Sequence, residues 1–268
     1  MNKILMVALF TLMVGRLEAQ LILPADSDNG RLVNLSNLAK DSETMIALVF
    51  GQSNAANRGQ TPYTPHNASV FNYYEGKLYR AKDPLIGNTG GGGSVWTHLA
   101  DMLIDSGRYK KVVLVPIAIG GSEIACWTSG DCAKKLDRTL AVLDSQHISL
   151  THIFWHQGET DNLNNTTKAI YKEHLATIYK TVRKYQSADF YIALASYHPS
   201  AINKPLGVDS LIRNAQQEFI SENKSVVKGP DTDQLIYAIY RYDSVHFSDF
   251  GLKAFAQLWM KAIKERKE

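Results

Sequence analysis

The sequence predicts an α/β protein, a three-layer α/β/α single domain with a mainly parallel sheet. Two observations lead to this prediction. Short runs rich in Val, Ile and aromatic residues alternate along the chain with amphipathic helical patterns. In addition, no internal repeat, linker or low-complexity stretch divides Leu21–Glu268. Strands that alternate with helices form parallel sheets with helices on both faces, because right-handed crossovers place them there.

The strand and helix predictions follow from composition and periodicity. The predicted strands are Met45–Phe50, Val112–Ile119, His152–His156, Phe190–Ala195 and Leu235–Tyr240. The predicted helices are Val95–Asp105, Lys134–Leu143, Thr167–Tyr185, Ser210–Glu222 and Asp249–Lys264. In the last of these, the apolar residues recur at spacings of three and four, which places them on one face.

One stretch, Arg58–Ser94, breaks the alternation because it contains Pro, Asn and Gly where a first crossover helix is expected. We predict a long loop near the site, with a hairpin around Glu75-Gly76. Its glycine-rich end, Gly87–Ser94, resembles a phosphate-binding loop but has no Lys-Ser/Thr pair after the glycines. A flexible loop that leads into the next helix is the favoured interpretation.

Charge and composition exclude some classes of partner. The net charge of +3 comes from dispersed Lys and Arg, and the dense run Lys261–Lys267 is typical of a solvated helix end. The chain therefore has no basic surface pattern that predicts a nucleic-acid partner. His152 and His156 share one side of a predicted strand, but no third ligand is evident nearby, so no metal site is predicted.

The first nineteen residues have the pattern of an export signal. Lys3 precedes an apolar stretch from Ile4 to Val14, and Ala19 stands before Gln20. We predict cleavage after Ala19, with residues 20–268 as the mature domain in the periplasm or secreted, without stable membrane insertion. An uncleaved anchor is the alternative. No Cys lies near the cut, so a lipid anchor is not predicted.

Two cysteines, Cys126 and Cys132, enclose a short segment whose Ser-Gly-Asp turn can bend the chain back on itself. In an oxidising compartment they are expected to pair. The alternative is two unrelated small core residues. Two cysteines without a matching Cys/His set do not predict a zinc site.

Four polar clusters follow predicted strands or precede the final helix, where reactive groups of open α/β sheets gather. They are Gly51-Gln52-Ser53-Asn54, Gly120-Gly121-Ser122, Gln157-Gly158-Glu159-Thr160-Asp161 and Asp243-Ser244-Val245-His246. Together these clusters contain every group that an acyl-transfer site needs.

A serine hydroxyl is a weak nucleophile and needs a positioned base, for which imidazole has a suitable pKa. Ser53 is the candidate nucleophile and His246 the candidate base, with Asp243 as the acid that orients the imidazole. The backbone N–H groups of Ser53 and Gly121 and the side-chain amide of Gln157 are candidate oxyanion donors.

Each cluster also has a structural interpretation. Ser53 is a candidate helix N-cap, Asp243 a turn residue, and His246 a buried hydrogen-bonded histidine. Glu159 is a candidate surface acid. The catalytic interpretation gains weight only from the four clusters occurring together and in this order.

That order resembles the SGNH hydrolases, which have a flavodoxin-like fold, and within them the branch of sialate O-acetylesterases and family 6 carbohydrate esterases. The resemblance rests on Gly51-Gln52-Ser53-Asn54, Gly120-Gly121-Ser122 with Trp127 following, Trp155-His156-Gln157-Gly158-Glu159-Thr160-Asp161 and Asp243-Ser244-Val245-His246-Phe247. The Gly-x-Ser-x-Gly elbow of α/β-hydrolases is absent around Ser53.

The resemblance implies a serine esterase that removes O-acetyl groups from a carbohydrate, such as acetylated sialic acid or xylan, through an acyl-serine intermediate and without a cofactor. Gln52, Asn54 and Trp127 are the expected substrate contacts, although core packing competes as the role of Trp127. Some members use the Glu of the Gln-Gly-Glu block as the acid, so Glu159 stays beside Asp243 as a candidate. Glu159 alternatively braces the loop that carries Gln157.

Two other functions share these residues. A carbohydrate O-acetyltransferase has the same acyl-serine half reaction, with a sugar hydroxyl in place of water. A non-catalytic glycan-binding module keeps the fold but loses the Ser, the His or an oxyanion donor, and none of these is missing here.

Overall fold

The computed structural model describes residues 30–38 and 41–266. The predicted export signal, residues 1–19, lies outside these residues. The strands of the described chain are β1 (Leu32–Val33), β2 (Thr44–Gly51), β3 (Val70–Tyr74), β4 (Lys77–Arg80), β5 (Lys111–Pro116), β6 (His152–His156), β7 (Asp189–Leu194) and β8 (Val226–Asp231). Its helices are α1 (Val95–Asp105), α2 (Cys126–Ser129), α3 (Asp131–Ser145), α4 (Glu159–Leu163), α5 (Lys168–Arg183), α6 (Ser210–Glu222) and α7 (Asp249–Glu265).

The strands form one mainly parallel sheet in the order β1-β4-β3-β5-β2-β6-β7-β8. The five strands from β5 to β8 run parallel, and β3 joins them in parallel beside β5. Only β4 and β1 are antiparallel to their neighbours. The predicted α/β fold with a mainly parallel sheet is therefore confirmed.

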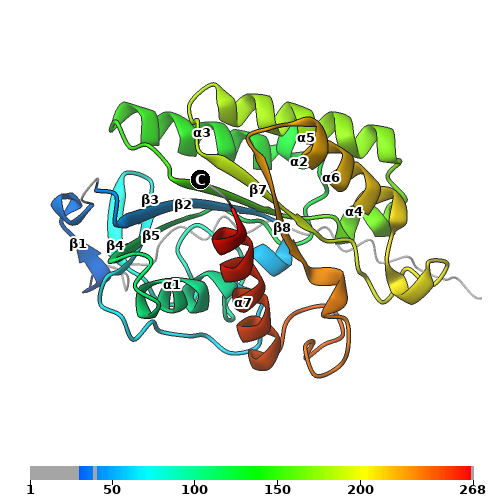
Figure 1. Cartoon of the computed structure of the whole chain (residues 1–268), viewed down its shortest axis with the longest axis horizontal. Coiled ribbons are helices and arrows are strands. Elements are labelled where there is room, and N and C mark those ends of the chain that lie inside the picture. Colours follow the sequence, from blue (N-terminus) through cyan, green and yellow to red (C-terminus); the bar gives the residue numbers. More distant parts are fainter. Residues whose placement is uncertain (1–29, 39–40, 267–268) are drawn as a thin grey trace, which may run out of the picture.

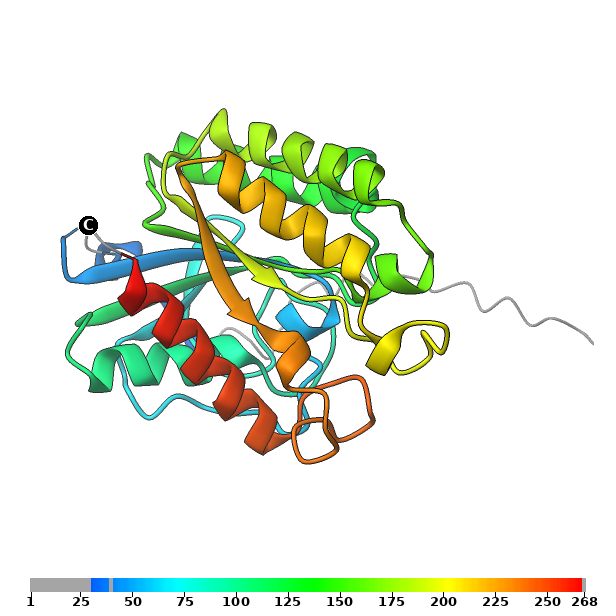
Figure 2. The same ribbon diagram turned by 45° about the vertical axis from the view of Figure 1, so that its right-hand side comes forward.

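Helices cover both faces of the sheet (Figures 1 and 2). Successive side chains of a strand point to opposite faces, and β2 divides its residues accordingly. Ile46 and Leu48 pack with α3, α5 and α6, whereas Ala47 and Val49 pack with α1 and α7. Because β2 is buried on both faces, it is a nearly continuous apolar run rather than an alternating one.

The hairpin predicted at Glu75-Gly76 is confirmed, since β3 and β4 pair antiparallel across that turn. Glu75 and Gly76 have φ values of 46° and 79°, as a two-residue hairpin turn requires. The hairpin also enlarges the sheet, because β3 pairs in parallel with β5.

The predicted strand Leu235–Tyr240 is wrong, and the last strand is Val226–Asp231 instead. Leu235–Tyr240 is a turn in which Tyr237 and Ile239 are exposed. The true strand was missed because it contains Gly229 and Pro230, which weaken a strand pattern. As an edge strand, β8 pairs only with β7 and so accommodates a proline.

The parallel strands end at one edge of the sheet, and the loops that follow them lie side by side there. Figure 2 shows the loop after β7 and the loop between β8 and α7 projecting from this end. No helix among the described residues is long and apolar enough to cross a membrane.

Candidate functional site

Ser53 begins a single helical turn, Ser53–Ala55, directly after β2. A glycine is required just before it, because Gly51 has a φ of 129° and a Cβ there would lie 1.9 Å from the His156 carbonyl oxygen. The residue in the N-cap position is Gln52, so Ser53 is not the cap of this turn. The Ser53 side chain is 7% exposed, and its hydroxyl donates no hydrogen bond to another described residue.

His246 is held by Asp243 on the loop that precedes α7. The Asp243 Oδ2 lies 2.7 Å from His246 Nδ1, and Asp243 Oδ1 accepts hydrogen bonds from the backbone N–H groups of Val245 and His246. With a carboxylate on Nδ1, that nitrogen carries the proton in the neutral ring and leaves the Nε2 lone pair available.

The carboxylate of Asp243 favours its ionised form. Partial burial works to raise its pKa, but the hydrogen bonds from His246 and Val245 outweigh this and lower the pKa below its ordinary value. An ionised Asp243 can stabilise the imidazolium that forms when His246 accepts a proton.

Asn54 connects the turn of Ser53 to the loop of His246. Its Nδ2 donates to Glu159 Oε1 at 2.9 Å and to the Val245 carbonyl oxygen at 3.3 Å. The residues adjacent to Ser53 and His246 are therefore joined directly, and the two candidate catalytic residues lie at one place. Asn54 is only 5% exposed, so it holds the site together and does not line its surface.

Glu159, the second candidate acid, begins α4 and is completely enclosed. Burial raises its pKa, although the hydrogen bond from Asn54 works in the other direction. Its Oε2 has no hydrogen-bond partner among the described residues. The hydrogen bonds that connect Glu159 to the His246 loop run through Asn54, which favours its alternative role as a brace.

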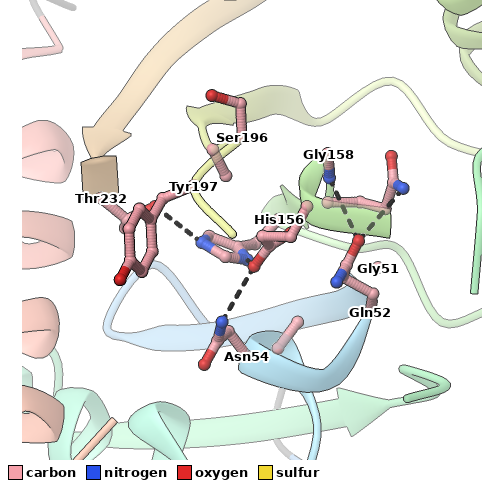
Figure 3. Close-up of polar contacts among 12 residues, drawn as sticks. Gly51, Gln52, Asn54, His156, Gly158, Ser196, Tyr197 and Thr232 are labelled. Atoms are coloured by element: carbon pink, nitrogen blue, oxygen red, sulfur yellow. Dashed lines mark hydrogen bonds and ion pairs between the residues drawn. The ribbon is translucent and has the colours of Figure 1, made fainter. Parts of the chain in front are cut away.

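Gln157 is fully buried and ties three chain turns together. Its Nε2 donates to Asp161 Oδ2 at 2.5 Å, to Gln52 Oε1 at 3.2 Å and to the Ser122 carbonyl oxygen at 3.3 Å. The Gln52 oxygen also accepts from the backbone of Gly158 (Figure 3). These contacts occupy the amide that was expected to bind an oxyanion, so the geometry does not favour that expectation for Gln157.

Gly121 lies beside the Ser53 turn. The Ile119 N–H donates to the Gly51 carbonyl oxygen at 3.0 Å, which fixes the end of β5 next to the end of β2. Gly121 has a φ of 71°, a value that glycine adopts without strain. The backbone N–H groups of Ser53 and Gly121 donate to no other described residue. Both remain available to an oxyanion.

Trp127, an expected substrate contact, is 1% exposed and belongs to the core. Its ring packs against Phe50 and Trp155, and its Nε1 donates to Ser122 Oγ at 3.0 Å. Trp127 is therefore not placed to contact a substrate, as was expected, and instead supports the turn that carries Gly121. The predicted disulfide between Cys126 and Cys132, by contrast, is confirmed.

Arg241 was not identified from the sequence, although it organises the His246 loop. Its guanidinium is buried, donates to the carbonyl oxygens of Leu235, Thr232 and Val245, and lies 3.8 Å from the centre of the Phe247 ring. Its partners are backbone carbonyls brought together by a turn, which no local motif signals.

No group of three or more His, Cys, Asp or Glu side chains that could hold a metal ion occurs in residues 30–38 and 41–266. The two histidines of β6 instead pack in the core. His152 stacks on Tyr191, and His156 Nε2 lies 2.9 Å from Thr232 Oγ1.

Two buried histidines, His98 in α1 and His152 in β6, predict a loss of stability in acid. Burial lowers the pKa of His98 and of His152 to about 4 each, from 6.5. Below pH 6.5 these two histidines gain a proton in the unfolded chain but stay neutral in the folded protein. The free energy of unfolding is therefore highest above pH 6.5 and falls as the pH decreases towards 4. Each group contributes a slope of up to about 1.4 kcal/mol per pH unit. Urea unfolding of His152→Gln across this range should show a shallower decline, and an unchanged slope would contradict the prediction.

Residues 43–265 match a protein family described as carbohydrate esterase, sialic acid-specific acetylesterase. This match covers most of the chain and includes all four polar clusters. No curated protein matches the sequence.

Solved structures share the fold. A protein from Arabidopsis thaliana is 18% identical with a TM-score of 0.64, over 84% of this chain and 99% of that one. NanS is 15% identical with a TM-score of 0.58, over 85% and 98% of the two chains. A carbohydrate acetylesterase from Xanthomonas citri is 15% identical with a TM-score of 0.51, over 82% of this chain and 55% of that one.

Proposed function

Because the chain belongs to the family of carbohydrate esterases described as sialic acid-specific acetylesterases, and is a hydrolase of ester bonds, we propose that it removes O-acetyl groups from carbohydrates through an acyl-serine intermediate. The observation that carries the proposal is the tether from Asn54 to Val245, which brings the turn of Ser53 to the loop of the His246–Asp243 pair.

In the first half reaction, Ser53 Oγ attacks the acetyl carbonyl carbon while His246 Nε2 accepts the hydroxyl proton. The tetrahedral intermediate collapses, the sugar oxygen takes that proton from His246, and the acetyl group remains on Ser53. A water molecule then attacks the acyl-serine, with His246 again as base. Acetate leaves and Ser53 recovers its proton.

The negative oxygen of the intermediate needs fixed donors, and two are provided by the N–H groups of Ser53 and Gly121, which donate to no acceptor in the described part of the chain. Gln157 contributes indirectly in this proposal, because its amide holds Gln52 and Ser122 in place. Backbone donors that are already fixed need no rearrangement when charge develops.

The proposed place of action is outside the cytoplasm. The Cys126–Cys132 disulfide supports this proposal, because disulfides persist in oxidising compartments. The predicted export signal at residues 1–19 is consistent with the same location.

An acetate-release assay tests the function. Purified protein, incubated without an acceptor sugar, should release acetate from O-acetylated sialic acid, acetylated xylan or another acetylated glycan. Acetate that appears only when an acceptor sugar is added would identify a transferase instead. Absence of acetyl transfer to water and to sugars would contradict the proposal. Treatment with a phosphonate ester, followed by peptide mass spectrometry, should locate the covalent adduct on Ser53.

A further inference from the structure

An aromatic side chain stands beside the candidate base. Tyr242 lies on the loop between β8 and α7, four residues before His246, and is 48% exposed. Its ring centre lies 6.4 Å from that of His246, and the two ring planes are inclined by 31°. Trp127, the aromatic residue that was expected to contact a substrate, is only 1% exposed. Tyr242 therefore offers next to the site the aromatic surface that Trp127 does not.

The ring of Tyr242 is fixed from both ends. Its backbone N–H donates to the His246 carbonyl oxygen at 3.0 Å, and Arg241 and Phe247 form the next antiparallel pair of the same turn. At the other end, the Tyr242 hydroxyl donates to the Arg58 carbonyl oxygen at 3.4 Å. A side chain that is already ordered loses little conformational entropy when a ligand packs on it.

The contact with Arg58 continues to the turn of a proposed oxyanion donor. Arg58 follows the helical turn Ser53–Ala55 by three residues. Its side chain lies against Gly120, where an added Cβ would be 3.5 Å from Arg58 Nε. Gly120 immediately precedes Gly121, which provides the second donor N–H in the proposed mechanism. Tyr242 thus lies on a chain of contacts that runs from the candidate base to the oxyanion turn.

The proposed chemistry places the sugar beside this ring. His246 Nε2 returns its proton to the sugar oxygen that leaves, so that oxygen has to come within about 3 Å of Nε2. The sugar ring is attached to the same oxygen and therefore lies next to the imidazole. The exposed aromatic ring at 6.4 Å from the imidazole is within reach of a group of this size.

We propose that the sugar that carries the acetyl group packs the apolar C–H face of its pyranose ring on the ring of Tyr242. The inference rests on the proposed function and names a residue that binds its substrate. A pyranose has C–H groups on its faces and hydroxyl groups at its rim, so its faces suit the apolar face of an aromatic ring. The contact involves the sugar ring and not the acetyl group, and it does not depend on the charge of the sugar.

The test separates binding of the sugar from the chemistry at Ser53. Acetate release is measured on the acetylated sugar that wild type cleaves fastest, with wild type, Tyr242→Ala, Tyr242→Phe and Tyr185→Ala. Inactivation by a phosphonate ester without a sugar group measures the reaction of Ser53 and His246 alone. Tyr185 is the matched control, because it is an exposed tyrosine between α5 and β7, before the start of a strand, whereas the site lies beyond the strand ends.

Tyr242→Ala should raise KM for the sugar by about 3- to 10-fold, because it removes an aromatic contact, and should leave kcat within about twofold of wild type. The rate constant of inactivation should change by less than about twofold, since the reacting groups are kept. Tyr242→Phe keeps the ring and should recover most of the loss in KM. Tyr185→Ala should have the wild-type KM. None of these quantities except kcat depends on the fraction of protein that is folded.

An unchanged KM in Tyr242→Ala would overturn the proposal. Equal losses in acetate release and in the rate of inactivation would do the same, because they would make Tyr242 a positioning residue for His246. A KM in Tyr242→Phe as high as in Tyr242→Ala would assign the effect to the hydroxyl and not to the ring face. Each of these results leaves the esterase function intact. Absence of acetate release by wild type from every substrate would instead contradict the proposed function itself.

Discussion

Replacement of Ser53 by alanine should abolish acetate release while leaving the protein folded. Removal of the nucleophile of an acyl-enzyme mechanism costs on the order of 10⁵- to 10⁶-fold in kcat, because the base and the oxyanion donors cannot act without it. The Ser53 hydroxyl donates no hydrogen bond to another described residue, so its loss should change the free energy of unfolding by less than about 0.5 kcal/mol.

The measurement pairs acetate release with thermal unfolding. Ser145→Ala is the matched control, because Ser145 is an exposed serine at the end of α3, which precedes the start of β6, whereas the candidate site lies beyond the ends of the strands. The control should retain wild-type activity. Ser53→Ala that loses only a few-fold in kcat would argue for a water nucleophile or another serine, even if the protein remains fully folded.

Much of the fold could be predicted because its sheet is buried on both faces. Strand β2 is apolar from Met45 to Phe50, and β6 has the apolar centre Ile153–Trp155. The helices α1 and α6 begin and end where their patterns do. Edge elements are less evident from the sequence. β8 pairs with a neighbouring strand on one side only and so accommodates Gly229 and Pro230. These two residues weaken the pattern from which a strand is predicted.

The site was predicted in part for a related reason. Ser53, Gly121 and His246 follow strands or precede a helix, and the topology of a parallel sheet brings such positions together. The direction in which a side chain points depends on contacts from distant segments. Gln157 therefore turns inward to Asp161 and Gln52, and Trp127 enters the core beside Phe50.

Arg241 illustrates what the pattern of residue types leaves open. It is a single arginine in a polar segment, and neither spacing nor composition distinguishes it from a surface residue. In the folded chain it is buried and donates to carbonyl oxygens of its own turn. Its role follows from neighbours that are close only in the folded chain.

Asp243→Asn should reduce kcat by on the order of 10⁴-fold, because an amide at this position no longer fixes the productive tautomer of His246 or stabilises the imidazolium. The direct 2.7 Å contact between the Asp243 carboxylate and His246 Nδ1 is the basis of this expectation. The lowered pKa of Asp243 keeps the wild-type group ionised at neutral pH.

Glu159→Gln should have a much smaller effect, about tenfold or less, since the amide oxygen can still accept the hydrogen bond from Asn54. Burial raises the pKa of Glu159 and so favours its neutral form, and a neutral carboxyl group cannot stabilise an imidazolium. Measuring kcat for both variants on one acetylated sugar decides between the two acids. A larger loss in Glu159→Gln than in Asp243→Asn would transfer the role of the acid to Glu159 and leave Asp243 as the residue that shapes the loop.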